Sequence, residues 1–182
     1  MKRVEFLIKF VQSPQTVGSI TPSSSFLAKA ILKPIEWQSI HSIVELGAGT
    51  GIFTGYIQKL KKPSCKTFIF ENDPDLQKKL TVRFPDMNHY SNAQDLTHFI
   101  SDSGLQSVDC IVSSLPFANF PGHLREHLLD EIQTILKPDG LFITYQYSLH
   151  MKKYIKERFK QVDIKFVLCN IPPAFVYICR QK

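Results

Sequence analysis

The chain has 182 residues, of which 43% are hydrophobic and 21% are charged, a length and balance that indicate one ordinary globular domain. No stretch approaches the roughly eighteen apolar residues of a membrane span, and the four cysteines form no Cys-x-x-Cys pair, so neither a transmembrane protein nor a metal site is expected. The net charge of +6 suits an anionic partner, either nucleic acid or an acidic lipid surface, without choosing between them.

The first predicted element is an amphipathic helix over residues 2–12. Its broad apolar face is formed by Val4, Phe6, Leu7, Ile8, Phe10 and Val11. Such a helix either docks on the core of its own domain or lies in the interface of an anionic membrane. The segment keeps Glu5 and Lys9 and lacks a small-residue cleavage site, so we expect no signal peptide. The dispersed cysteines indicate a reducing, cytoplasmic location.

A polar loop then leads into a second predicted helix, which ends before Lys33 and Pro34. Ser23, Ser24 or Ser25 can cap this helix. The loop is well placed to close over a bound ligand. We therefore expect residues 1–34 to form an N-terminal helical extension to a core over residues 40–182, within a single domain.

The third segment is a strand, a glycine turn and a helix. A buried strand over residues 41–46 is followed by Gly47, Ala48, Gly49 and Gly51, and a helix over about residues 50–60. Glycines let the chain turn sharply and let a ligand lie against bare backbone. The alternative is a turn that binds nothing. The second gap is one residue shorter than in a dinucleotide fold, and Glu45 precedes the turn. This E-x-G-x-G-x-G pattern resembles motif I of class I S-adenosylmethionine methyltransferases.

A second strand over residues 66–71 ends in Glu71, 24 residues after Gly47, with Asn72 next. An acid at this place accepts hydrogen bonds from both ribose hydroxyls of an adenosine, although it can also be a strand-end carboxylate in water. A helix over residues 73–84 and a short strand over residues 87–90 follow. The next segment contains Asn92, Ala93 and Asp95, and either Asn92 or Asp95 can supply a polar side chain to the adenine edge.

The fourth strand, over residues 107–114, includes Ser113 and leads into Ser114-Leu115-Pro116-Phe117. Methyltransferases that act on amino nitrogens often carry a similar turn here. A proline-fixed turn aims backbone carbonyls and a side-chain oxygen at an acceptor amine, so that the nitrogen lone pair points at the methyl group. The aromatic ring then packs on the acceptor. The alternative is an apolar turn with Phe117 in the core.

The remaining pattern completes an α/β fold. It predicts a helix over residues 121–136, a turn over 137–140, a strand over 141–147, a helix over 151–159 and a final strand pair over 162–168 and 174–179. Tyr145, Tyr147 and His150 are candidates to bind or deprotonate a substrate head group. Both tyrosines can equally be interior aromatics of a central strand.

Three segments together resemble the bacterial phospholipid N-methyltransferases, which methylate phosphatidylethanolamine, and their ornithine-lipid relatives. The segments are residues 17–24, 112–117 and 170–177. The resemblance implies a Rossmann-like class I methyltransferase with a seven-stranded, mostly parallel sheet whose last strand is antiparallel, between layers of helices. It implies S-adenosylmethionine as cofactor, a lipid amine as substrate, and peripheral membrane attachment through the first helix. One departure is Asn92, where those enzymes commonly carry an aspartate.

Two other functions compete with this one. The adenine-N6 dimethylases of ribosomal RNA share the glycine pattern, but they use Asn-Leu-Pro-Tyr where this chain has Ser114 and Phe117. The chain also ends at Lys182 without a helical RNA-binding domain, so a nucleic acid is the less favoured partner. The third possibility is a non-catalytic, membrane-associated regulator that binds the cofactor. The oligomeric state has no signal in the sequence.

Overall fold

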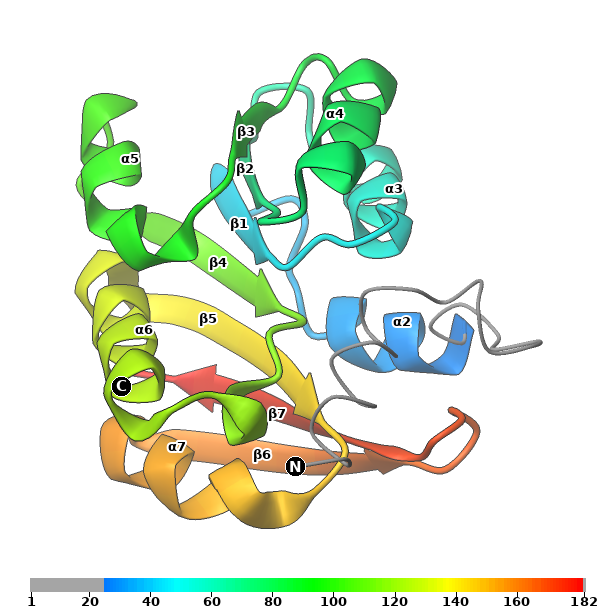
Figure 1. Cartoon of the computed structure of the whole chain (residues 1–182), viewed down its shortest axis with the longest axis vertical. Coiled ribbons are helices and arrows are strands. Elements are labelled where there is room, and N and C mark those ends of the chain that lie inside the picture. The colour runs from blue at the N-terminus through cyan, green and yellow to red at the C-terminus, as the bar shows by residue number, and fades with distance from the viewer. Residues whose placement is uncertain (1–24, 182) are drawn as a thin grey trace.

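A computed structural model of the chain describes residues 25–181 (Figure 1). The predicted amphipathic helix over residues 2–12, the polar loop ahead of the second helix, and the first segment of the family resemblance lie outside the described residues.

One seven-stranded sheet crosses the domain in the order β3-β2-β1-β4-β5-β7-β6. The strands are β1 (Ser42–Leu46), β2 (Lys66–Phe70), β3 (Asn88–Tyr90), β4 (Val108–Ser113), β5 (Leu136–Gln146), β6 (Gln161–Val167) and β7 (Ala174–Arg180). β1 to β5 run parallel, whereas β7 is antiparallel to both of its neighbours. The predicted sheet is therefore confirmed. The strand order reverses between β1 and β4, and ligands of open α/β sheets bind at the carboxyl ends of the strands beside such a point.

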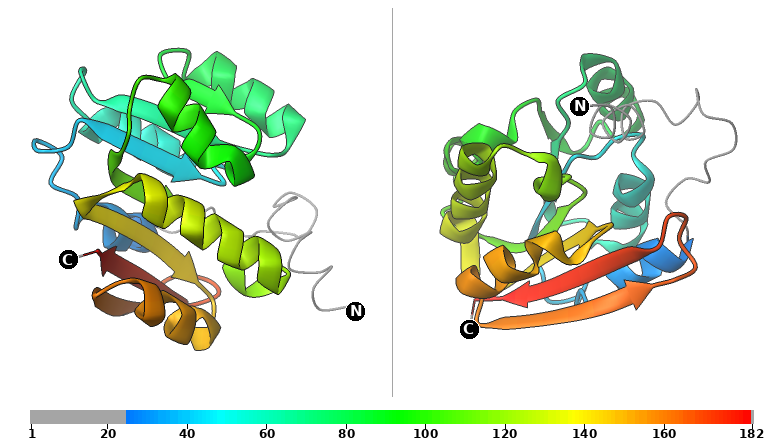
Figure 2. Two further views of the ribbon diagram at one scale, coloured as in Figure 1. Left: turned by 90° about the vertical axis from the view of Figure 1, so that its left-hand side faces the viewer. Right: turned by 60° about the horizontal axis from the view of Figure 1, so that its bottom comes forward.

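Helices cover both faces of the sheet (Figures 1 and 2). They are α2 (Ser25–Leu32), α3 (Ile52–Leu60), α4 (Pro74–Arg83), α5 (Leu96–Asp102), α6 (Gly122–Ile135) and α7 (Lys152–Arg158), with short 3₁₀ turns η1 (Ala93–Asp95), η2 (Phe117–Asn119) and η3 (Leu149–Met151). One core cluster lies between the sheet and α5, α6 and α7, and a second lies under α2 and α3. Strand β1 is buried along its whole length because both faces are covered.

The structure differs from the predicted elements in two places. Helix α5 was not predicted. It starts where Glu131 of α6 accepts a hydrogen bond from the Thr97 amide at 2.7 Å, a tertiary cap that replaces a local one. The predicted turn over residues 137–140 was wrong, because β5 already begins at Leu136. The register of β5 on β4 shifts within this stretch, between the pairs Val108–Leu136 and Cys110–Leu141. Within residues 25–181, no helix combines the length and the apolar character needed to cross a bilayer.

Candidate active site

The glycine turn after β1 is tied to the neighbouring strand β2. The amides of Gly47 and Ala48 both donate to the Phe70 carbonyl, at 2.8 and 3.2 Å. The Gly49 amide donates to Glu71 Oε2 at 2.6 Å. The Ala48 side chain is buried in a small apolar cluster. These bonds hold the turn and the acid after β2 together as one unit.

All three glycines of the turn have left-handed backbone angles, with φ of 75° at Gly47, 57° at Gly49 and 79° at Gly51. They differ in what a side chain would meet. A Cβ on Gly51 would lie 2.7 Å from Leu80, and one on Gly47 would lie 3.1 Å from Leu115. A Cβ on Gly49 would meet nothing within 4 Å. Gly49 is thus the glycine beside which the protein leaves open space.

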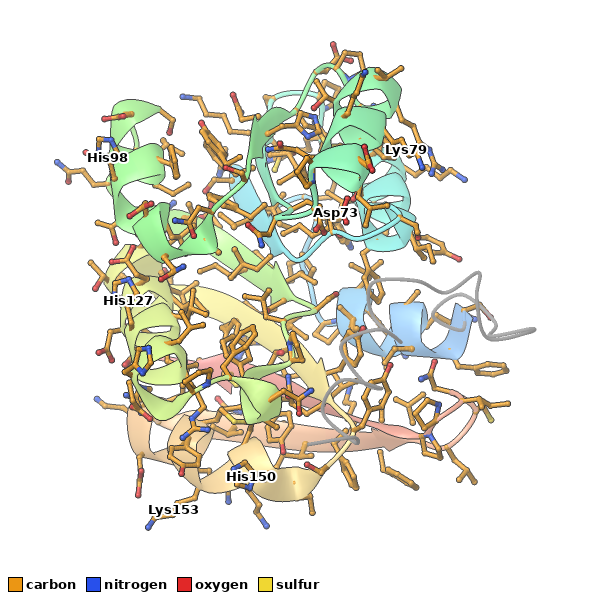
Figure 3. All side chains as sticks on the ribbon, in the orientation of Figure 1. Asp73, Lys79, His98, His127, His150 and Lys153 are labelled. Atoms are coloured by element: carbon orange, nitrogen blue, oxygen red, sulfur yellow. The ribbon has the colours of Figure 1, made fainter. Side chains whose placement is uncertain are left out.

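Glu71 lies directly after β2 and is held by two backbone amides. Its Oε2 accepts from Gly49 and its Oε1 accepts from the Asp73 amide at 2.9 Å. Asp73, labelled in Figure 3, also caps α4 through its own carboxylate. Each carboxylate oxygen of Glu71 has a second lone pair, so two hydroxyl donors can still be accepted. Asn72, next in the chain, is exposed.

Glu45 is the one acidic residue buried within the central strand, and its side chain is fully inaccessible. Thr54 of α3 donates to its Oε2 at 2.7 Å, whereas Oε1 is buried with no hydrogen-bond partner among the described residues. Burial, with a smaller contribution from the charge of Glu71, raises the pKa of Glu45 to about 8 against the opposing effect of the Thr54 hydrogen bonds. An unpaired, buried carboxylate oxygen is a site that a cationic ligand group would stabilise.

The segment after β3 is preorganised by its own side chains. Asn92 caps η1 by accepting from the Gln94 amide at 3.0 Å, and its Nδ2 donates to Asp95 Oδ2 at 2.8 Å. The two residues predicted as alternatives for adenine contact therefore hold each other. Ala93 packs against the larger core cluster.

The turn after β4 meets the glycine turn. The Ser114 amide donates to the Leu46 carbonyl at 2.8 Å, which joins the ends of β4 and β1. The Leu115 side chain approaches Gly47, and Ser113, itself buried, accepts from the Leu115 amide at 3.2 Å. Ser114 Oγ is buried without a hydrogen-bond partner among the described residues. Ser114 therefore has a hydroxyl that can still form a hydrogen bond, at the residue that joins β4 to β1.

Gln146, at the end of β5, braces this turn and was missed by sequence reasoning. Its Nε2 donates to the Leu115 carbonyl at 2.9 Å and its Oε1 accepts from the Ala118 amide at 3.4 Å. It is 4% exposed. A polar residue between two tyrosines at the end of an apolar strand was the signal available. Thr54, the partner of Glu45, was also missed, and its signal was only a hydroxyl in the first turn of the helix after the glycines.

The aromatic candidates separate into two groups. Phe117 is fully buried and packs edge-on against Phe120 and Phe142, so the structure supports its alternative reading, a core side chain, and corrects the prediction that its ring packs on the acceptor. Pro116 sets the backbone just before η2. Tyr145 and Tyr147 lie edge to face at 5.8 Å between ring centres, at the carboxyl end of β5.

The surroundings of the tyrosines limit what they can do. Tyr145 also contacts Phe53 of α3, at 6.2 Å between ring centres. Partial burial and the neighbouring Tyr145 phenol raise the pKa of Tyr147, so near neutral pH it is a phenol that donates a hydrogen bond and not a base. His150 is exposed in η3 beside Tyr154 (Figure 3).

These features fit S-adenosylmethionine. The cofactor has ribose hydroxyls for Glu71, an amino group for the unpaired oxygen of Glu45, and a body that needs the open space beside Gly49. An open α/β sheet of this order, with a glycine turn after β1 and a fixed acid after β2, defines a class I methyltransferase.

Comparisons with known proteins agree. Residues 44–144 match the family described as a methyltransferase domain. Over 181 residues the chain is 33% identical to an ornithine lipid N-methyltransferase of Singulisphaera acidiphila, which covers 96% of this chain and 94% of that protein. A second relative is ribosomal RNA small subunit methyltransferase A of Thermotoga maritima, 26% identical over 132 residues, 71% of this chain and 45% of that protein.

A solved structure gives the same fold. The 1,6-didemethyltoxoflavin-N1-methyltransferase of Burkholderia thailandensis, solved with 1,6-didemethyltoxoflavin and S-adenosylhomocysteine bound, matches with a TM-score of 0.70 at 15% identity, over 98% of this chain and 86% of that one. The chain therefore belongs to the methyltransferase domain family. It is an S-adenosylmethionine-dependent methyltransferase.

Proposed function

We propose that this enzyme methylates the amino nitrogen of a membrane-lipid head group of the phosphatidylethanolamine or ornithine-lipid kind. The observation that carries the proposal is the 33% identity to an ornithine lipid N-methyltransferase, which extends over nearly the full length of both chains. The aligned region covers 96% of this chain, so it spans both the glycine turn after β1 and the turn over residues 113–117, which we call the acceptor turn.

In this proposal, different acidic residues of the protein bind different polar groups of the cofactor. Glu71, fixed by the Gly49 and Asp73 amides, would hold the ribose hydroxyls. Glu45 would hold the amino group through its unpaired oxygen. S-adenosylmethionine, when bound, supplies an electrophilic methyl group on a positively charged sulfur.

The turn over residues 113–117 would orient the acceptor. Ser114 Oγ and the backbone carbonyls of the turn can accept hydrogen bonds from an amine, which fixes the direction of the lone pair on the amine nitrogen. Gln146 holds the turn in place through hydrogen bonds to the backbone of Leu115 and Ala118, on either side of Pro116. Alignment of this kind is the main contribution that a displacement by a neutral amine needs from a protein.

An ammonium group must lose a proton before its nitrogen can attack. Tyr147, with its raised pKa, stays protonated near neutral pH. It is therefore suited to hydrogen-bond the head group, and we propose that the proton leaves to water. The predicted helix over residues 2–12 would attach the enzyme to an anionic membrane as a peripheral protein.

The deciding experiment is methyl transfer from radiolabelled S-adenosylmethionine. The full chain is offered phosphatidylethanolamine or ornithine lipid in mixed anionic vesicles, and ribosomal RNA in parallel. We expect label in the lipid phase, and the preferred lipid identifies the head group. Label in RNA alone would favour the function named for the Thermotoga relative. Label in neither, with cofactor binding verified by calorimetry, would refute lipid methylation.

A further inference from the structure

Four large apolar side chains are exposed on two neighbouring elements at one end of the sheet. Phe166, Leu168 and Ile171 belong to the hairpin of β6 and β7 and are 56%, 67% and 77% exposed. Phe26 of α2, which packs on the face of β6 and β7 opposite to Phe166, is 58% exposed, so the four side chains border the hairpin on both of its faces. We call these four residues the hairpin patch. The hairpin lies beyond α2 at the lower right of Figure 1 and projects from the sheet in the right-hand view of Figure 2.

Within α2 and the hairpin of β6 and β7, the charged residues nearest in sequence to the hairpin patch are lysines. Between Asp163 and Arg180 the only charged residue is Lys165, which is exposed. Exposed Lys29 of α2 follows Phe26 at a spacing of three, on the same helix face. Exposed Lys33 comes directly after α2, and its amide still donates to the Lys29 carbonyl at 2.9 Å. Apolar side chains bordered by lysines, without carboxylates between them, suit the boundary between acyl chains and anionic head groups.

The hairpin patch also lies at the edge of the sheet where the active site is built. Gln146, which braces the acceptor turn, pairs with Phe175 of β7, and Phe175 pairs in turn with Phe166 of β6. The rings of Phe166 and Phe175 are 4.9 Å apart. Gln146 and Phe166 are therefore two strand spacings apart, about 10 Å across the sheet. A surface bound there would present its head groups to the site.

We propose that the hairpin patch inserts into the head-group region of an anionic bilayer, as a membrane contact separate from residues 2–12. The inference deepens the proposed function, on which it rests for the identity of the partner. Bound this way, the enzyme would draw the lipid amine from the plane of the membrane, with Lys29, Lys33 and Lys165 on the phosphates.

The hairpin contains a natural reporter. Cys169 is exposed between Leu168 and Ile171, whereas Cys65, Cys110 and Cys179 are buried. An environment-sensitive fluorophore on Cys169 should shift to the blue and gain intensity when vesicles of phosphatidylethanolamine and phosphatidylglycerol are added. An unchanged spectrum at saturating vesicles would overturn the proposal. So would a spectrum already blue-shifted without lipid, because another segment of the chain or a second copy would then cover the patch.

Substitution gives the second test. The L168D/I171D variant should partition into these vesicles at least about tenfold more weakly, since each buried aliphatic side chain contributes about an order of magnitude. The control variant L60D/V82D places the same charges on exposed apolar residues of α3 and α4, at the far end of Figure 1, and should bind like the wild type. Equal partitioning of both variants would contradict the proposal, and circular dichroism checks that both are folded.

A water-soluble, short-chain phosphatidylethanolamine below its micelle concentration separates this inference from the proposed function. The L168D/I171D variant should methylate it as the wild type does, while its rate on vesicles falls. If the wild type methylates no lipid but Cys169 still reports insertion, the proposed function fails and the membrane contact stands. If lipid is methylated but neither test detects the hairpin, the membrane contact fails alone.

Discussion

At the scale of single residues, the glycine turn shows how one backbone conformation serves different ends. Gly51 is required by packing, because a side chain there would collide with Leu80. Gly49 faces open space, so only its backbone conformation and the ligand limit the residue there. The sequence predicted the turn from its spacing. It could not distinguish these two roles, because they depend on side chains of α4 brought in by the fold.

Gly49→Val should weaken the binding of S-adenosylmethionine at least about a hundredfold, because the valine side chain fills the space beside the turn. The left-handed conformation adds a backbone cost of about 1–2 kcal/mol. Gly104→Val is the matched control, since Gly104 has a φ of 81° and also nothing within 4 Å of its built Cβ. Calorimetry should show loss of binding only for the first variant, and similar melting temperatures for both. Normal binding by Gly49→Val would remove this turn from the cofactor site.

The burial of Glu45 leads us to predict that one substitution there stabilises the folded chain and weakens cofactor binding. Its pKa is raised to about 8 in the folded chain, above the value in the unfolded chain. The folded state therefore binds more protons, and stability falls as the pH rises through the interval between the two pKa values. Glu45→Gln removes this term, so without cofactor it should gain about 1–3 kcal/mol over the wild type at pH 8 and little at pH 5.

The same variant should bind S-adenosylmethionine at least about tenfold more weakly, because a neutral amide replaces the partner of a cation. Thermal unfolding from pH 5 to 8 and calorimetric binding check the two halves of this prediction. Glu36→Gln, on an exposed residue before β1, controls for the lost charge. A variant that is no more stable than the wild type at pH 8 would contradict the buried placement of Glu45.

At the scale of elements, prediction succeeded where the pattern was local. The apolar runs of β1, β2 and β4, and the glycine turn, can each be read from a short window. Helix α5 has only Leu96 and Ile100 buried, and its start is capped by Glu131, 34 positions away. No local window contains that cap. The acceptor turn was predicted by motif, but Gln146, which positions it from 31 residues away, was not.

Gln146→Leu tests the bracing of the acceptor turn. The substitution leaves the Leu115 carbonyl and the Ala118 amide without their partner, at a cost of about 1–3 kcal/mol in stability. We expect the KM for the lipid amine to rise and kcat to fall several-fold, while the Kd for S-adenosylmethionine stays unchanged. Gln133→Leu removes a comparable hydrogen bond, to the Arg158 carbonyl at 2.8 Å, away from the site. If both variants lose activity equally, Gln146 has a structural role alone.

At the scale of the whole molecule, the sheet order and the parallel direction of β1 to β5 bring the glycine turn, the acceptor turn and the hairpin of β6 and β7 to neighbouring positions along one edge. The sequence predicted the order of elements, and the fold follows from it. It could not show that α2 and the hairpin of β6 and β7 are neighbours, because their proximity depends on the packing of α2 against these two strands. The net charge of +6 likewise indicated an anionic partner, but it did not indicate where on the molecule that partner binds.

The position of the charge, and not its sum, should decide membrane binding. The variants K29E/K33E and K78E/K79E have the same net charge, but the first reverses lysines beside the hairpin patch and the second reverses exposed lysines of α4, at the other end of the molecule (Figure 3, Lys79). With about 1 kcal/mol per lysine near an anionic surface, K29E/K33E should weaken binding to phosphatidylglycerol vesicles by at least about tenfold. K78E/K79E should change it far less, and the difference should shrink as salt screens the surface. Equal losses for the two variants would mean that the net charge acts at long range and that the enzyme has no oriented contact with the bilayer.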